Sequence, residues 1–103
     1  MATFQQINVH EAHDLIKKGN VLLVDIRDRA SYEADHIAQA VLVNDHNIKE
    51  FLAGSAKDKD LICYCYHGIG SLGAAQFFQE NGFENVYSIE GGFEQWRKVY
   101  DNL

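Results

Sequence analysis

The stretch that decides the fold runs from Leu61 to Leu72 and reads LICYCYHGIGSL. It opens as an uninterrupted apolar run, which predicts a buried β-strand. The run ends at Cys65, a glycine-bearing loop follows, and residues 71–80 have the composition of a helix. A loop that precedes a helix points backbone N–H groups inward, at the positive end of the helix dipole. Because that environment stabilises a thiolate, we expect Cys65 to be a nucleophile.

Apolar and amphipathic segments alternate along the rest of the chain. Besides the strand that starts at Leu61, short apolar segments predict strands at 4–7, 21–24, 41–43 and 85–89. The segments between and after them predict helices near 9–18, 30–34, 48–54, 71–80 and 93–100. This alternation predicts an α/β fold, a five-stranded parallel sheet with helices on both faces. Sites in such sheets form at the carboxyl ends of the strands, where Cys65 lies.

Two of the predicted helices carry readable local signals. Asn8, followed by Glu11, forms a potential capping box at the start of the first helix. The helix that follows the Cys65 loop has an apolar stripe of Leu72, Ala75 and Phe78, which we expect to pack on the sheet.

Length and composition limit the possible functions. A chain of 103 residues with 47% hydrophobic residues is expected to form a single domain, spanning 1–103. Its net charge of −6 argues against nonspecific nucleic-acid binding, which depends on neutralising phosphates. Neither a membrane-spanning run nor the features of a signal peptide are seen. Two cysteines only two residues apart on one strand cannot easily form a disulfide, which favours a reduced, cytoplasmic protein.

Cys63 lies inside the apolar run, and we expect it to be a protonated, inert core residue. A metal site formed by Cys63, Cys65 and His67 is the alternative interpretation. Zinc sites normally use four ligands, and no second Cys/His pair with a fitting spacing occurs in the chain. We therefore expect that these three residues do not form a metal site.

A phosphatase is the more serious alternative, because phosphate-binding cysteine loops also join a strand to a helix. Such a loop needs five residues and then an arginine, which clamps the phosphoryl oxygens. Ser71 occupies that position here, and the chain has no arginine between Arg29 and Arg97. The loop therefore disfavours phosphate transfer.

Polar residues also follow the strand at 21–24. They are Asp25, Arg27, Glu33 and His36. We expect each to have a structural role, in a turn, a cap or a hydrogen-bonded histidine, rather than a catalytic one. Trp96 and Tyr100 of the last helix are likewise expected in the core and not on a binding surface.

Three segments together resemble the rhodanese family of sulfurtransferases. The segments are Asp25-Ile-Arg27 with Tyr32-Glu33, His36-Ile37 and Ala40; the loop Cys65–Ser71; and Val86-Tyr87 with Glu90-Gly91-Gly92-Phe93 and Trp96. The likeness covers roughly residues 7–96 and is close to the bacterial single-domain thiosulfate sulfurtransferases of that family. Three positions depart from the family pattern. Asp35 stands where a glycine is usual, Ile69 replaces a polar residue, and Gly70 occupies a place where many members carry an arginine.

This resemblance implies a single rhodanese-like domain with thiosulfate sulfurtransferase activity. Cys65 stands in the persulfide-forming place. The amides of the loop are then expected to bind the transferred sulfur; the loop residues are Tyr66, His67, Gly68, Ile69, Gly70 and Ser71. Thiosulfate would be the donor, and cyanide or a thiol or dithiol acceptor such as thioredoxin would collect the sulfur, without a cofactor.

Two other functions stay open at this stage. The chain could be a persulfide carrier that a partner protein loads, or a non-catalytic binding module on the same fold. A reactive Cys65 favours the enzyme or the carrier, whereas an inert Cys65 favours the binding module. The oligomeric state and the physiological donor and acceptor are not determined by the sequence.

Overall fold

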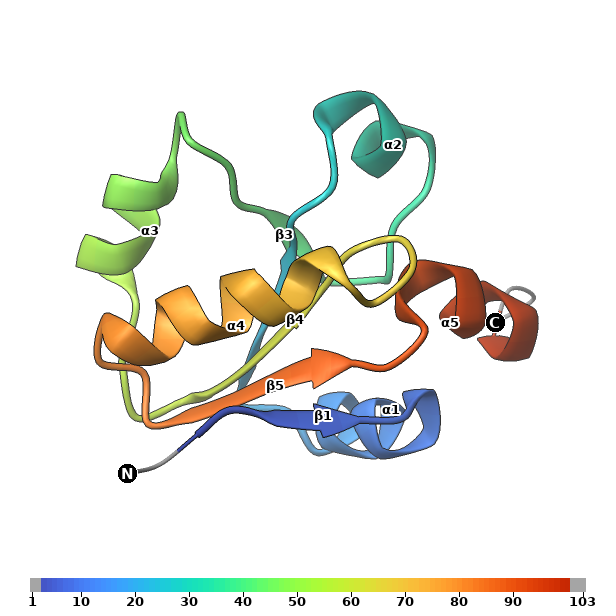
Figure 1. Cartoon of the computed structure of the whole chain (residues 1–103), viewed down its shortest axis with the longest axis horizontal. Coiled ribbons are helices and arrows are strands. Elements are labelled where there is room, and N and C mark those ends of the chain that lie inside the picture. Colours follow the sequence, from blue (N-terminus) through green and yellow to red (C-terminus); the bar gives the residue numbers. More distant parts are fainter. Residues whose placement is uncertain (1–2, 101–103) are drawn as a thin grey trace.

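Five parallel strands form one sheet in the order β1-β5-β4-β2-β3 (Figure 1). The structure, a computed structural model, describes residues 3–100. The strands are β1 (Gln5–Ile7), β2 (Val21–Asp25), β3 (Val41–Leu42), β4 (Asp60–Tyr64) and β5 (Asn85–Ile89). The helices are α1 (Val9–Lys18), α2 (Arg29–Ala34), α3 (Ile48–Gly54), α4 (Gly70–Glu80) and α5 (Gly92–Tyr100). The predicted α/β fold with a five-stranded parallel sheet is confirmed, while the ends of the predicted domain, residues 1–2 and 101–103, lie outside the described residues.

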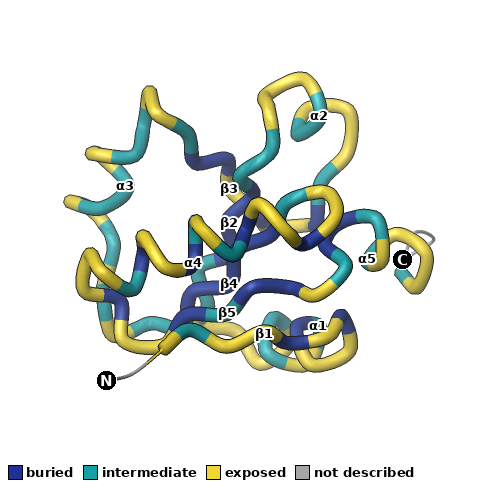
Figure 2. Tube along the Cα trace, viewed as in Figure 1, coloured by how far each residue is buried: buried dark blue, intermediate teal, exposed yellow. Residues whose placement is uncertain are grey.

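Strand β4 lies at the centre of the sheet, and its residues 61–64 are completely buried (Figure 2). Leu61 and Cys63 pack in one core cluster with residues of α3 and α4. Ile62 and Tyr64 pack in a second cluster, on the side of α1 and α5. Because neighbouring residues of a strand point to opposite faces, a continuous apolar run is what a sheet covered on both faces requires. The prediction of helices on both faces is therefore confirmed.

The start of α1 follows the predicted capping box. The side chain of Asn8 accepts a hydrogen bond from the Glu11 N–H at 2.8 Å, and the Asn8 N–H donates to the Glu11 carboxylate at 3.0 Å. These two bonds satisfy backbone donors that a helix start would otherwise leave without partners. Within residues 3–100, none of the helices is both long enough and apolar enough to cross a membrane.

The buried face of α4 differs from the predicted stripe. Ser71, Ala75 and Phe78 are buried, whereas Leu72 is only half-buried, so the prediction for Leu72 was wrong. A stripe chosen by hydrophobicity passes over a serine, because a buried hydroxyl costs free energy unless it is hydrogen-bonded. Ser71 has such a partner in Ser88, which makes its burial possible.

The polar residues at the end of β2 and after it have the structural roles that we expected. Asp25 is completely buried, and its carboxylate accepts hydrogen bonds from the Arg27 N–H at 2.8 Å and the Arg27 Nη2 at 2.7 Å. Arg27 Nη2 also donates to the Asp35 carbonyl at 2.6 Å, and its guanidinium lies 4.2 Å from the centre of the Phe93 ring. Arg27 thereby connects β2, the segment after α2 and α5. A buried carboxylate needs such a partner, because an unpaired buried charge is very costly.

Glu33 and His36 also contact other parts of the protein rather than the Cys65 loop. Glu33 is exposed, and its carboxylate lies 3.8 Å from Arg29. His36 stacks on the Tyr32 ring with 3.9 Å between ring centroids, and its Nδ1 lies 2.7 Å from the Tyr32 carbonyl oxygen. The expected hydrogen-bonded histidine is confirmed.

Candidate active site

Cys65 lies directly after β4, and the loop 65–69 leads into α4 at Gly70. The Sγ atom of Cys65 accepts hydrogen bonds from the N–H of Gly68 at 3.1 Å and from the N–H of Ser71 at 3.2 Å. The hydroxyl of Ser71 lies 3.5 Å from the same sulfur. Three potential donors therefore converge on one half-buried sulfur at the N-terminus of a helix.

These contacts favour the ionised form of Cys65. Burial acts to raise the pKa of its thiol, but the hydrogen bonds from the Ser71 hydroxyl and from the amides of Ser71, Gly68 and Gly70 outweigh burial. The net result is a pKa below the ordinary value of a cysteine. The dipole of α4 acts in the same direction. A thiolate, the form that attacks electrophiles, is therefore more populated at neutral pH than in free cysteine.

Ser88 takes part in the site, although we did not predict a role for it from the sequence. It lies on β5, is buried, and its Oγ is 2.7 Å from the Oγ of Ser71. In the parallel register of the sheet, Ser88 stands opposite Cys63, at the end of the strand next to the cysteine loop. When Ser88 donates to Ser71, the Ser71 hydroxyl is free to donate to the Cys65 thiolate. The only sequence signal is a polar residue among apolar ones in a strand, which is not specific.

The N-terminus of α5 fixes the other side of the loop. The Phe93 N–H donates to the Cys65 carbonyl at 2.8 Å, and the Glu94 N–H donates to the Tyr66 carbonyl at 2.9 Å. With these carbonyls directed at α5, the amides of Gly68 and Ser71 are directed at the sulfur. The loop thus lies between the N-termini of α4 and α5, as Figure 1 shows.

Two glycines permit this close packing. Gly92 has a φ of 60°, and a methyl group added to it would lie 2.6 Å from the Tyr66 carbonyl oxygen and 2.7 Å from the Gly68 nitrogen. Gly68 has a φ of 89°, and an added methyl would lie 2.7 Å from the Gly91 nitrogen. Any side chain at these positions would separate α5 from the loop.

The side chains of Tyr66, His67 and Ile69 are exposed to solvent, Ile69 to 75%. The Nδ1 of His67 lies 3.1 Å from a carboxylate oxygen of Glu94. Gly70 begins α4 without a positive φ, and a methyl added there would make an ordinary contact of 3.7 Å with the Cys65 sulfur. Of the six predicted loop residues, Gly68 and Ser71 donate hydrogen bonds to the sulfur of Cys65, and the Gly70 amide also acts to lower the pKa of this thiol.

Cys63 is completely buried and unpaired, as expected for a core residue. Its Sγ lies 3.5 Å from the carbonyl oxygens of Ser71 and Tyr87. Burial, with a smaller contribution from Cys65, raises the pKa of this thiol to about 12, so it stays protonated near neutral pH. Within residues 3–100, no group of three or more His, Cys, Asp and Glu side chains is arranged to hold a metal ion.

Ser88→Ala is expected to make the thiolate of Cys65 less stable relative to the thiol. The substitution removes no group that contacts the sulfur. The Ser71 hydroxyl loses the donor that orients it, so its hydrogen bond to the sulfur weakens and the pKa of Cys65 should rise toward the ordinary value of a cysteine. Alkylation of the thiolate becomes faster as the pH rises through the pKa. The midpoint of a plot of iodoacetamide reaction rate against pH should therefore move to higher pH in the variant.

Ser71 provides the matched control for this measurement. Ser71→Ala should raise the midpoint further, because it removes a hydroxyl that contacts the sulfur. In the Ser71→Ala background, Ser88→Ala should have no additional effect, because Ser88 acts through Ser71. Equal shifts for Ser88→Ala in both backgrounds would show that the proposed relay of hydroxyls does not exist.

Nearly the whole sequence is similar to proteins of one known family. The family model described as a rhodanese-like domain matches residues 8–99. Thiosulfate sulfurtransferase GlpE of Coxiella burnetii (strain RSA 331 / Henzerling II) is 43% identical over 94 residues, which are 91% of this chain and 88% of that protein. Thiosulfate sulfurtransferase GlpE of Pseudomonas paraeruginosa is 43% identical over 98 residues, covering 95% of this chain and 88% of that protein.

A solved structure gives the same result for the fold. The crystal structure of a rhodanese-related protein from Thermoplasma volcanium has a TM-score of 0.80 and 24% identity to this chain, and the match covers 94% of both chains. At that identity the likeness concerns the fold alone. The family model and the two relatives extend over nearly all of the sequence, and they confirm the resemblance inferred from its motifs. The chain belongs to the rhodanese-like domain family.

Proposed function

We propose that this rhodanese-type sulfurtransferase moves the outer sulfur of thiosulfate to cyanide or to a thiol or dithiol acceptor, through a persulfide on Cys65. The observation that carries the proposal is the convergence of the Gly68 N–H, the Ser71 N–H and the Ser71 hydroxyl on one sulfur atom. Thiosulfate is the substrate named for the relatives that are 43% identical. A protein dithiol such as thioredoxin has the chemistry of the acceptor.

In the first half-reaction, the Cys65 thiolate attacks the outer sulfur of thiosulfate. A new S–S bond forms at Cys65, the S–S bond of thiosulfate breaks, and sulfite leaves with the electron pair. Negative charge then resides on the terminal sulfur of the persulfide. The amides of Gly68 and Ser71 already face the Sγ atom of Cys65, so they need little rearrangement to stabilise a charge on the sulfur bonded to it. The positive end of α4 contributes in the same way.

In the second half-reaction, the acceptor attacks the terminal sulfur and Cys65 leaves as a thiolate. Cyanide becomes thiocyanate. A dithiol first takes the sulfur as its own persulfide, and its second thiol then releases hydrosulfide and closes a disulfide. Because the enzyme holds the sulfur covalently between two substrates, ping-pong kinetics are expected.

The proposal is tested by following thiocyanate formation from thiosulfate and cyanide while both concentrations are varied. Parallel lines in a double-reciprocal plot are expected for the covalent scheme. A carrier that only a partner protein loads would take up no sulfur from thiosulfate alone. A binding module would neither take up sulfur nor turn over, so these outcomes contradict the proposal.

We expect the affinity for thiosulfate to be modest, because the protein carries a net charge of −6 and thiosulfate is a dianion. Gly70→Arg should lower the Michaelis constant for thiosulfate about ten- to a hundredfold, since a charge-assisted hydrogen bond contributes roughly 1.5–3 kcal/mol. The backbone at Gly70 accepts a side chain without strain. Steady-state kinetics at fixed acceptor concentration measure the effect.

Gly70→Met is the control for this prediction, because it adds a side chain of comparable length without charge. Its Michaelis constant should stay near that of the wild type. The improvement in Gly70→Arg should also diminish as sodium chloride is added, since salt screens charge interactions. A folded Gly70→Arg variant with unchanged kinetics would show that the backbone amides alone saturate thiosulfate binding.

A further inference from the structure

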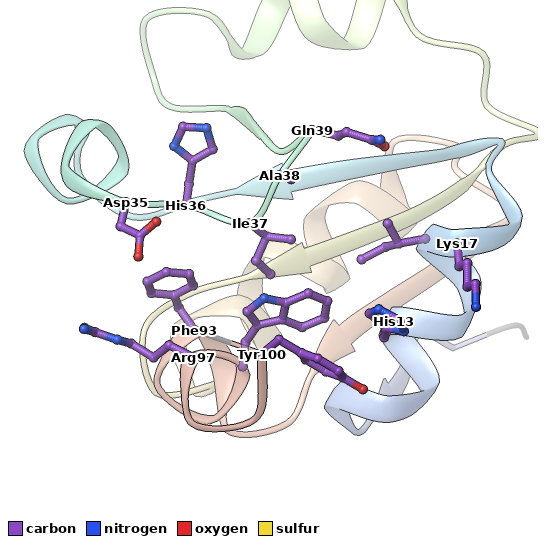
Figure 3. Close-up of a pocket in the computed structure, with 12 residues that line it drawn as sticks. His13, Lys17, Asp35, His36, Ile37, Ala38, Gln39, Phe93, Arg97 and Tyr100 are labelled. Atoms are coloured by element: carbon purple, nitrogen blue, oxygen red, sulfur yellow. The ribbon is translucent and has the colours of Figure 1, made fainter. Parts of the chain in front are cut away.

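A cavity of about 430 Å³ lies apart from the cysteine loop, between α1, α5 and the segment 35–39 (Figure 3). Figure 3 shows the segment 35–39 on one side of it, α5 on the other, and α1 closing one end. No residue of the loop 65–71 lines this cavity. The volume lies within the range of small-molecule sites. The cavity is therefore a second place where a ligand could bind, separate from the sulfur of Cys65.

Aromatic rings form one wall of the cavity. His13 of α1 stacks on Tyr100 of α5 with 4.5 Å between ring centroids and an angle of 11° between planes. Trp96 packs beside Tyr100 with 4.7 Å between centroids, and Phe93 also lines the cavity. Trp96 and Tyr100 were expected to be core residues; they pack against the core but are only half-buried and line this cavity. Flat rings left partly uncovered favour a flat aromatic ligand.

The charges around the cavity are mainly positive although the protein is acidic. Lys17 and Arg97 lie at opposite ends (Figure 3), and neither forms an ion pair with any residue of the segment 3–100. Asp35 is the one carboxylate among the described residues that line the cavity. Two unpaired cations favour an anionic ligand, and they disfavour the cationic ligands that aromatic cages otherwise bind.

We propose that this cavity binds a planar aromatic anion. The ring of the ligand would lie against Trp96 and Tyr100, and its carboxylate or a similar group would pair with Arg97 or Lys17. The proposed site is separate from the Cys65 sulfur, because none of the residues that contact this sulfur lines the cavity.

Titration of the full ¹⁵N-labelled chain with 2-naphthoate tests the proposal. The chain contains a single tryptophan, so the indole N–H signal of Trp96 reports on the cavity without ambiguity. At about 0.3 kcal/mol of binding free energy for each non-hydrogen atom, a ligand of this size has a dissociation constant on the order of 1 mM. We expect a saturable shift of the indole signal in that range. No saturable shift up to about 10 mM would overturn the proposal.

Neutral and cationic analogues of 2-naphthoate test whether binding requires the negative charge of the ligand. 2-Naphthalenemethanol and 2-naphthylmethylamine keep the ring, and both should bind about tenfold or more weakly than 2-naphthoate. Cyclohexanecarboxylate keeps the charge and should also bind more weakly, because it cannot stack. If the neutral or the cationic analogue binds as tightly as the acid, the site is not specific for anions and the proposal fails.

Each cation that lines the cavity is followed in the sequence by a lysine that does not line it, and these lysines provide control variants. Arg97→Gln or Lys17→Gln should weaken 2-naphthoate binding about tenfold, and at least one of them must do so. Lys98→Gln and Lys18→Gln remove the same charge from residues that do not line the cavity, and they should have no such effect. Alkylation of Cys65 with iodoacetamide should leave binding unchanged. Loss of binding after alkylation would place the ligand at the cysteine loop and would overturn the assignment.

Discussion

Cys65→Ser is expected to lower sulfur transfer from thiosulfate about a thousandfold or more, because loss of a covalent nucleophile is among the largest effects in enzymes. No second thiol can replace it. Cys63 is completely buried, and its pKa of about 12 keeps it protonated. Serine at position 65 is a far weaker nucleophile near neutral pH, so the hydrogen bonds of the loop cannot compensate.

Intact-mass measurement after mixing with thiosulfate checks this prediction directly. The wild-type protein should gain one sulfur atom, about 32 Da, and lose it on reduction or on addition of cyanide. Cys65→Ser should show no gain. Cys63→Ala is the matched control and should retain most of the sulfur uptake, while losing about 1 kcal/mol of stability from removed core volume. An adduct that survives Cys65→Ser, or that maps to Cys63, would contradict the assignment.

Gly92→Ala is expected to have the largest effect on stability. A left-handed residue with a side chain costs about 1–2 kcal/mol, and overpacking adds about 1–3 kcal/mol, so the free energy of unfolding should fall by about 2–5 kcal/mol. The added methyl would meet the carbonyl oxygens of Cys65 and Tyr66. The hydrogen bonds from Phe93 and Glu94 to these carbonyls should therefore be lost, and alkylation of Cys65 should slow at neutral pH. Urea denaturation and the alkylation rate measure the two effects.

Gly73→Ala is the control for this variant. Gly73 lies inside α4, and a methyl added to it would meet no atom within 4 Å. Since alanine favours a helix interior over glycine, this variant should be more stable by about 0.5–1 kcal/mol, with unchanged alkylation of Cys65. Equal stability of Gly92→Ala and the wild type would show that α5 can move away from the loop without cost.

The strand, loop and helix around Cys65 could be predicted because their signals are local. An apolar run predicts a buried strand, and the glycines after Cys65 predict a tight loop. The same local character explains the capping box at Asn8, where two side chains three residues apart contact each other's backbone. The parallel sheet follows from the alternation of such elements, since parallel neighbours require a crossover connection.

The α4 stripe and Ser88 could not be predicted in this way. A helical stripe is inferred from hydrophobicity, and this criterion prefers Leu72 to Ser71. The buried position of Ser71 depends on a hydrogen bond to Ser88, which is 17 residues away in the chain. The two serines meet because α4 packs against β5. No local pattern contains that information.

The sequence by itself determined the α/β fold and the family, because hydrophobic periodicity and sequence motifs act over a few residues. It also predicted Cys65 as the nucleophile. Only the tertiary structure decided which groups reach the sulfur. It placed the N-terminus of α5 on the carbonyls of Cys65 and Tyr66 and the amides of Gly68 and Ser71 on the thiolate. It also brought α1, α5 and the segment 35–39 together around a cavity. Hydrogen bonds and cavities depend on distances between elements, and sheet order and helix packing set those distances.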